Sequence, residues 1–472
     1  MILPLIISEV FIDDAQAKEK NPCAKNPCAK KEKAKPIRKS TITDSAKLME
    51  MGEKLWNNDK LGKSGMSCAT CHSGDVPLKG EDFLLDYWKR PIPLQVPGFK
   101  LQVPNSNSEL RTPNSELPLS LHPDACDECH KEQYNDWKDS IHSKAMGAGL
   151  LSQLEPHNDP ETAVSCYYCH APMMEQSEVK HQSPVEGNYT KNPFFDNKLK
   201  LSGVSCSVCH LRGGKVYGPP AREIKGQGSG VKGQGQNEHS GFIEKDFFER
   251  AEFCAACHQM DEGYELNGKV LTNIYREWKN SFYGENNITC QNCHMPDRQH
   301  LWRGIHNPEM VRNGINIKLI PYEKGGKLVI INNNVGHFFP TYVTPLITVK
   351  RFMIDKRGEI IPSSLKEEFI GRKVGLDLTQ EFFDTRIAPQ KSFEFDYNPP
   401  SSSFRKGGQG RFSNGDKLVF EVLVYPDKFY NDFFSNMLKE DNIGIEKKEL
   451  EQAWKNSSES SYLLWKKEIT LK

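Results

Sequence analysis

The stretch Cys290-Gln291-Asn292-Cys293-His294 decides the fold of this chain, because its C-x-x-C-H pattern occurs six times. Two thiols at this spacing can add to the two vinyl groups on one edge of a porphyrin, and the histidine that follows can then bind the iron. The pattern is the attachment signature of c-type haem. We therefore predict six covalently bound c-type haems, each with its iron.

The six motifs use twelve of the fourteen cysteines. The predicted haem-binding thiols are Cys68, Cys71, Cys126, Cys129, Cys166, Cys169, Cys206, Cys209, Cys254, Cys257, Cys290 and Cys293. The predicted proximal iron ligands are His72, His130, His170, His210, His258 and His294. Cys23 and Cys28 lack both the spacing and the following histidine, so they belong to a flexible tail or form a disulfide.

Three other uses of cysteine fit the pattern less well. Paired C-x-x-C units bind zinc, but a zinc site does not require a histidine after every second cysteine. A redox-active C-x-x-C motif is expected once, near a βαβ pattern, and would not recur six times. A disulfide within one motif closes too small a loop to restrict the unfolded chain much.

The composition excludes some classes of protein. The chain has 472 residues, with 62 Lys+Arg against 62 Asp+Glu and 37% apolar residues. This length allows about two to four domains. The absence of a basic excess argues against a nucleic-acid partner, and no apolar run reaches the roughly 18–20 residues of a membrane-spanning helix.

The spacing of the motifs indicates how the interior is filled. From Cys126 to His294 there are 169 residues for five sites. About 34 residues per haem cannot enclose each haem in a core of its own. The haems are therefore expected to lie against one another and to act as the core.

Covalent haem also predicts the compartment, because a cysteine-rich chain of this kind is typical of an oxidising environment and thioether attachment takes place outside the cytoplasm. We expect an exported protein, periplasmic or extracellular. Residues 1–7 are apolar and Ala15-Gln16-Ala17 resembles the small-x-small site before cleavage, although Glu9 interrupts the apolar run.

Changes in composition along the chain predict its organisation. The expected parts are a signal segment (1–17), a disordered lead-in (18–40), a monohaem cytochrome c-like segment (41–89), a Pro-rich linker or arm (90–123), a five-haem cytochrome domain (124–314) and a β-sandwich-like domain (315–472). The predicted fold class is thus a mostly α and irregular multihaem cytochrome c region followed by a C-terminal all-β sandwich-like domain.

The β-domain is predicted from alternating apolar runs separated by turn signals. These runs are residues 328–331, 347–353, 392–395 and 418–424. Two short helices, near 427–438 and 447–456, are expected to interrupt the strands.

Eight histidines remain after the six proximal ligands, which is enough for a distal histidine on every iron. The predicted distal ligands are His122, His142, His239, His300, His306 and His337. His157 and His181 lie in polar loops and are the expected non-ligands. For His337, in Gly336-His337-Phe338-Phe339-Pro340, a ligand and a packed turn are equally compatible with the sequence.

A short repeat surrounds His142. Tyr134, Trp137 and Ser140 recur as Tyr275, Trp278 and Ser281, and Tyr283 stands where His142 would be repeated. The repeat indicates an internal duplication of a haem-binding unit, or else a coincidence between two amphipathic helices.

Residues from about 120 to 345 resemble the multihaem cytochromes c related to the tetrahaem cytochrome of nitrifying bacteria and to hydroxylamine oxidoreductase. One matching feature is the motif at 126–130 followed by Trp137, Ser140 and His142. A second is Gly203-Val204-Ser205-Cys206, and a third is Trp278 and Ser281 before Thr289-Cys290-Gln291-Asn292-Cys293-His294-Met295-Pro296. The fourth is Gly336-His337-x-x-Pro340-Thr341. The resemblance implies a mostly helical fold around closely paired haems that serve electron transfer, with His142 as a distal ligand.

The chain also departs from these relatives. It has six motifs instead of four or eight, and it has no C-x-x-C-K motif, so the lysine-ligated haem of pentahaem nitrite reductases is absent. Residues 51–68 resemble the opening of small monohaem cytochromes c, but no Met follows between His72 and Lys144 to serve as a distal ligand.

Three functions are compatible with this sequence. The leading one is an exported electron carrier that passes electrons between redox partners, such as cytochromes and quinol-oxidising complexes, or to an extracellular acceptor. The second is an oxidoreductase that acts on a small nitrogen or sulfur compound at one haem with an open distal site. The third is a subunit of a cytochrome filament or cell-surface complex, which would require self-assembly.

Overall fold

The computed structural model describes residues 121–472, apart from 155–159, 182–188, 213–214, 221–242, 261–263, 324, 398–414, 440–446 and 472. Every described residue lies in one compact unit, within residues 85–472. The predictions for residues 1–120, including the motif at 68–72, lie outside the described residues, as do those for His157 and His239.

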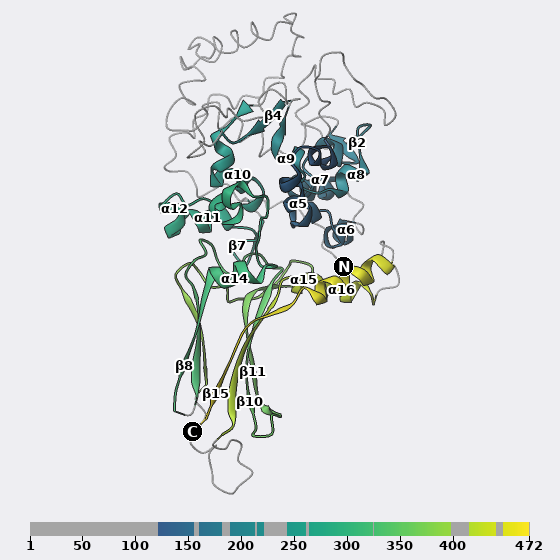
Figure 1. The fold of residues 1–472 in the computed structure, drawn as a ribbon. Helices are drawn as coiled ribbons and strands as arrows, with labels where there is room; N and C mark the ends of the chain where they lie inside the picture. Colours follow the sequence, from purple (N-terminus) through teal and green to yellow (C-terminus); the bar gives the residue numbers. More distant parts are fainter. Residues whose placement is uncertain are drawn as a thin grey trace, which may run out of the picture. The chain divides into compact units, whose positions relative to one another are not determined.

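Residues 121–314 form short helices joined by irregular segments and small strands (Figure 1). The helices are α4 (Pro123–Asp127), α5 (Lys131–Asp139), α6 (Ala148–Leu154), α7 (Pro160–His170), α8 (Asn197–Leu201), α9 (Cys206–His210), α10 (Ala251–His258), α11 (Ile274–Lys279), α12 (Phe282–Glu285), α13 (Cys290–His294) and α14 (Pro308–Gly314). The short strands are β1 (Val179–His181), β2 (Tyr189–Lys191), β3 (Leu211–Arg212), β4 (Lys215–Gly218), β5 (Ile243–Glu244), β6 (Glu265–Leu266) and β7 (Lys269–Val270). Single 3-10 turns occur at His142–Lys144, Met174–Gln176, Asp246–Glu249 and Pro296–Arg298.

The haem-attachment motifs occupy equivalent places in these helices. Helices α7, α9, α10 and α13 all end at the histidine of a C-x-x-C-H motif. Residues three apart lie on the same face of a helix. Each of these helices therefore presents both thiols of its motif to one side.

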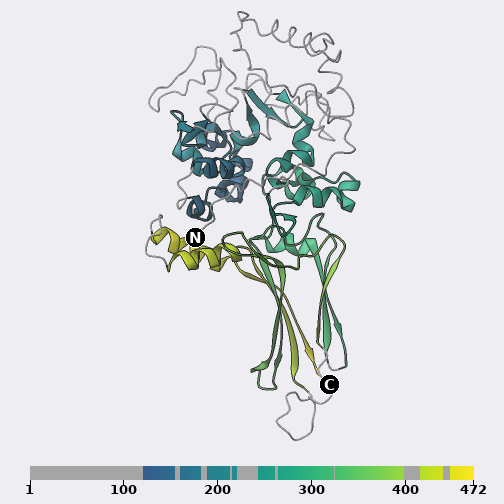
Figure 2. The ribbon, with the colours of Figure 1, turned by 180° about the vertical axis from the view of Figure 1, so that it is seen from behind.

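From Ile315 onward the structure is dominated by long strands. These are β8 (Ile315–Pro321), β9 (Gly326–Asn332), β10 (Leu346–Ile354), β11 (Ile360–Val374), β12 (Glu381–Asp384), β13 (Ser392–Tyr397), β14 (Lys417–Tyr425) and β15 (Tyr462–Thr470). One antiparallel sheet has the order β12-β11-β10-β14-β15 and the other β13-β9-β8. Helices α15 (Lys428–Met437) and α16 (Lys447–Glu459) lie between β14 and β15 in the sequence, and Figure 2 shows them from behind.

The two sheets share one hydrophobic core. Leu328 and Ile330 of β9 belong to the same buried cluster as Val349 of β10 and as Leu418 and Phe420 of β14. Val349 lies opposite Val422 in the β10–β14 ladder, so apolar side chains of neighbouring strands meet on the buried face. This packing gives the β-rich region a core made of side chains.

The structure confirms a helical cytochrome region followed by a β-rich C-terminal region. All four predicted strands fall within β9, β10, β13 and β14, and both predicted helices are present as α15 and α16. Within the described ranges, no helix combines the length and the apolar character needed to cross a membrane.

Candidate haem sites

A cavity of about 3780 Å³ connects all the described attachment motifs. Pockets for drug-sized ligands have volumes of roughly 300–1,000 Å³, so this one can hold several large groups. The histidines of the five described motifs line it, namely His130, His170, His210, His258 and His294. The cavity is therefore of the size and lining that several adjacent porphyrins require.

The motifs contact one another through their thiols. Side-chain hydrogen bonds join Cys126 to Cys206, Cys169 to Cys257, and Cys254 to Cys290. The contact with Cys290, together with burial, raises the pKa of Cys254. Since α10 contributes to two of these three pairs, its motif lies at the centre of the group.

The motif histidines are oriented by hydrogen bonds from Nδ1. His170 Nδ1 lies 2.8 Å from the carbonyl oxygen of Ala145, His210 Nδ1 lies 2.8 Å from that of Tyr217, and His294 Nδ1 lies 2.7 Å from that of Arg303. A carbonyl accepts a proton from Nδ1, so Nε2 remains available as the metal ligand, which is the usual arrangement at metal-bound histidines. This observation supports the fit of these residues to haem iron.

Three pairs of histidine rings have nearly the same separation. The ring centroids are 6.2 Å apart for His142 and His258, and 6.2 Å apart for His210 and His300. They are 6.4 Å apart for His294 and His337. Two imidazoles that share one metal, with metal–nitrogen bonds of about 2.0–2.1 Å and a nitrogen roughly 1 Å from each centroid, would have centroids about 6 Å apart. Each pair thus has the spacing of two axial ligands on one iron.

The paired histidines are enclosed by protein although they face the cavity. Desolvation lowers the pKa of His142 to about 3, and the nearby His258 acts in the same direction. Desolvation likewise lowers the pKa of His258 and of His337 to about 4. These rings are neutral near pH 7, which is the form that binds metal.

Trp302 packs against two of the distal candidates. Its ring centroid is 4.6 Å from that of His142 and 5.2 Å from that of His300, both in edge-to-face geometry. The backbone N–H of His300 donates to Asp136 at 3.0 Å. Among the described residues, the buried Nδ1 atoms of His142 and His300 have no hydrogen-bond partner.

Two other distal candidates contact carboxylates, and His306 is one of the residues that line the cavity. His122 Nε2 is 2.9 Å from a carboxylate oxygen of Asp196, and His306 Nε2 is 2.9 Å from one of Asp427. His181 lies in β1, and its side chain is outside the described part of the chain.

The repeated units around His142 and Tyr283 adopt the same local structure. The indole N–H of Trp137 donates to the carbonyl of Val204 at 2.8 Å, and that of Trp278 donates to Ile288 at 2.8 Å. Each helix is followed by a serine whose hydroxyl donates back to the tryptophan carbonyl at 2.7 Å. The units differ at the equivalent ring, because the Tyr283 hydroxyl donates to the carbonyl of Asn333, at 3.4 Å.

The loop between β9 and β10 brings two residues of the β-rich region to the cavity. The buried Asn332 holds this loop, since its side-chain amide donates to the carbonyls of His337 and Ile387, both at 2.9 Å. His337 then faces His294, and the Tyr342 hydroxyl contacts Nδ1 of His258. Tyr342 was missed by sequence reasoning, and the only available signal was its place just after the Gly336-His337-x-x-Pro340-Thr341 segment.

A close approach at Gly336 allows this loop to pack. A Cβ atom at this position would lie 3.1–3.2 Å from Tyr283, Ser281 and Trp278. A side chain there would push the loop away from α11 and α12. Glycine therefore lets the loop that carries His337 pack closely against these side chains.

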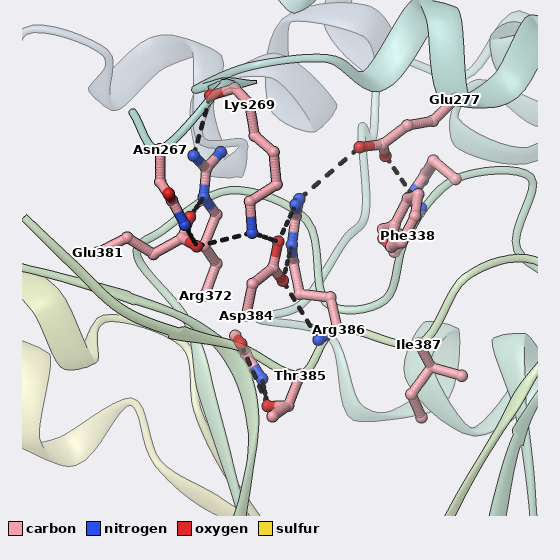
Figure 3. Close-up of polar contacts among 12 residues, drawn as sticks. Asn267, Lys269, Glu277, Phe338, Arg372, Glu381, Asp384, Thr385, Arg386 and Ile387 are labelled. Atoms are coloured by element: carbon pink, nitrogen blue, oxygen red, sulfur yellow. Dashed lines mark hydrogen bonds and ion pairs between the residues drawn. The ribbon is translucent and has the colours of Figure 1, made fainter. Parts of the chain in front are cut away.

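A network of charges joins the β-rich region to the haem region (Figure 3). The fully buried Arg372 of β11 donates to Glu381 at 2.8 Å and to the carbonyls of Leu266, Lys269 and Val270 in the β6–β7 hairpin. Lys269 in turn contacts Glu381 and Asp384.

The same network reaches the His337 loop. Asp384 pairs with Arg386, whose guanidinium lies 3.7 Å from Glu277. The backbone N–H of Phe338 donates to the other carboxylate oxygen of Glu277 at 3.0 Å. Burial raises the pKa of Glu277, against the effect of that N–H. Helix α11 therefore fixes the residue next to His337.

Comparisons with known proteins found cytochromes similar to this chain. Residues 125–211 match the family described as cytochrome c554 and c-prime. Over 153 residues the chain is 29% identical to cytochrome c-554 of Nitrosomonas europaea, and the match covers 30% of this chain and 59% of that protein. A solved penta-heme cytochrome c552 from Thermochromatium tepidum is 17% identical, with a TM-score of 0.48, over 73% of this chain and 97% of that one.

The helices that end in C-x-x-C-H, the shared cavity, the family match and the match to cytochrome c-554 all point to one class of protein. Residues 125–211 carry the match to the cytochrome c554 family, so this region is similar to the multihaem cytochromes c, as the resemblance predicted. Proteins of this class bind c-type haem and its iron covalently.

Proposed function

We propose that the protein is an exported hexahaem c-type cytochrome that transfers electrons between redox partners or to an extracellular acceptor. The observation that carries this proposal is the set of three histidine pairs with centroids 6.2–6.4 Å apart inside one cavity. Iron with two axial histidines is saturated, and it exchanges electrons without binding a substrate.

The pairing assigns distal ligands. His300 would serve the haem at Cys206 and Cys209, and His142 the haem at Cys254 and Cys257. His337 would serve the haem at Cys290 and Cys293. The remaining haems would be attached at 68–72, 126–130 and 166–170.

The thiol contacts support a continuous path for electrons. Cys126 contacts Cys206, Cys254 contacts Cys290, and Cys257 contacts Cys169. Thioether bonds at these thiols would hold neighbouring porphyrin edges close together, as electron transfer between haems requires. The partners would be other redox proteins, such as cytochromes or quinol-oxidising complexes.

The β-rich region would form a β-sandwich-like domain of residues 315–472 that completes two haem sites. Its support is the core shared by its two sheets and the loop that carries His337 and Tyr342.

Haem stoichiometry and iron spin state test the proposal. The full chain, matured by a haem-attachment system, should show an intact mass with six added haems and electron paramagnetic resonance dominated by low-spin ferric signals. A bare polypeptide mass, or spectra dominated by high-spin iron, would refute it. A spectral change of the reduced protein on addition of nitrite or hydroxylamine would instead favour the oxidoreductase.

A further inference from the structure

We propose that the haem at Cys254 and Cys257 has the highest reduction potential of the three haems whose histidines are paired, because Tyr342 stands where a carbonyl acceptor would lower that potential more strongly. This inference rests on the proposed function, because it uses the axial pairs assigned there. Tyr342 acts through His258 and is therefore a positioning residue.

The three pairs differ in what their Nδ1 atoms contact. In the pair of His294 and His337, both Nδ1 atoms face backbone carbonyls, at 2.7 and 3.0 Å. In the pair of His210 and His300, the Nδ1 atom of His210 faces a carbonyl at 2.8 Å, and the backbone carbonyl of Arg298 beside His300 acts to raise the pKa of that ring against the effect of burial. The Nδ1 atom of His300 is buried with no partner among the described residues.

In the pair of His142 and His258, neither Nδ1 atom faces a backbone carbonyl in the described part of the chain. The Nδ1 atom of His142 is buried without a hydrogen-bond partner there, and that of His258 contacts the Tyr342 hydroxyl. A phenol oxygen is a weaker acceptor than an amide carbonyl, because its lone pair is delocalised into the ring. The two axial ligands of this haem therefore receive the least polarisation from their surroundings.

Polarisation of Nδ1–H controls the donor strength of Nε2. A strong acceptor gives the imidazole partial imidazolate character and makes it a more basic ligand. A more basic ligand stabilises ferric over ferrous iron and lowers the reduction potential. The order of potentials should be lowest for the haem at 290–294, intermediate for that at 206–210, and highest for that at 254–258.

The fold holds Tyr342 in place for this contact. Its backbone has a φ of 65°, which is uncommon for a residue other than glycine. Such conformations persist only where the surrounding structure imposes them. The anchored loop between β9 and β10 provides that constraint.

The wild-type protein alone provides a first test, because each pair has its own angle between ring planes. The angles are 67° for His142 and His258, 38° for His210 and His300, and 17° for His294 and His337. Nearly perpendicular rings give a low-spin ferric signal with a large maximal g value, and nearly parallel rings give a rhombic signal. In a potentiometric titration followed by electron paramagnetic resonance, the large-g signal should disappear first on reduction, and the rhombic signal later. The reverse order would overturn the inference.

Tyr342→Phe provides the second test, because it removes the phenol oxygen and keeps the ring. In a potentiometric titration the large-g signal should move to a higher potential, with up to a tenfold rise in the ratio of ferrous to ferric iron at a fixed potential, or about 59 mV for one electron. The control Tyr462→Phe removes a hydroxyl that donates to the carbonyl of Ile305 at 2.8 Å and should leave every transition unchanged.

The outcomes separate the two proposals. An unchanged large-g transition in Tyr342→Phe, or a shift confined to the signal of another haem, would overturn the role of Tyr342 while six low-spin haems remain. A high-spin signal or haem loss in this variant alone would show a merely structural role. Missing haems or dominant high-spin iron in the wild type would instead refute the proposed function.

Discussion

Replacing Arg372 with methionine should cost about 3 kcal/mol of unfolding free energy. The guanidinium is completely buried and donates at 2.8–2.9 Å to Glu381 and to three carbonyls of the β6–β7 hairpin. Removing one partner of a buried ion pair costs about 3–5 kcal/mol, since the other charge and the polar groups lose their partners. The lower end applies here, because Glu381 keeps Lys269 at 2.7 Å and Asn267 at 3.0 Å.

The assay is urea unfolding of the holoprotein followed by far-ultraviolet circular dichroism. A loss of 3 kcal/mol corresponds to a fall in melting temperature of roughly 6–12 °C for a region of this size. The matched control is Lys373→Met, the exposed neighbour on β11, which should change stability by less than about 0.5 kcal/mol. If both variants cost the same, the reasoning that Arg372 joins the two regions is wrong.

Three further predictions concern the network and the sites. Burial opposes the ionisation of Asp384, but Arg386 and Lys269 outweigh that effect and lower the pKa of Asp384 to about 2. The lowered pKa stabilises the folded state by roughly 2 kcal/mol. This stabilisation is present above about pH 4 and is lost as the pH falls toward 2. In urea titrations between about pH 5 and 2, the unfolding free energy of the wild type should fall by roughly 2 kcal/mol more than that of Asp384→Asn. Equal losses in the two proteins would contradict the stabilising role of Asp384. His300→Ala should convert one haem to a high-spin form that binds carbon monoxide when reduced, and an unchanged low-spin spectrum would exclude His300 as a ligand. Gly336→Ala should cost about 1–3 kcal/mol in thermal melts because its Cβ lies 3.1–3.2 Å from three side chains, and a neutral change would show that the loop can move.

Local patterns in the sequence predicted the parts of this fold that depend on local chemistry. The short apolar runs rich in β-branched and aromatic residues located β9, β10, β13 and β14, because such side chains favour buried strands. The C-x-x-C-H spacing located the attachment sites, because both thiols and the imidazole act within one helical turn.

The pairing of histidines could not be predicted in this way. His142 and His258 lie on different helices, and only the packing of those helices brings their rings to 6.2 Å. Arg372 lies in β11, a long strand in which exposed polar residues hide the apolar pattern, so neither the strand nor its buried charge was predicted. Tyr342 has no motif, because its role depends on a partner 84 residues away.

The position of His337 in the chain has a consequence for assembly. On the proposed pairing, the haem at Cys290 and Cys293 receives its second axial ligand from a loop that is synthesised after every attachment motif and held by strands that follow it. During maturation that iron would pass through a five-coordinate stage, open to small exogenous ligands, until the carboxyl-terminal strands closed over it. A chain cut short before residue 337 would thus keep every thioether and still differ in reactivity from the finished protein.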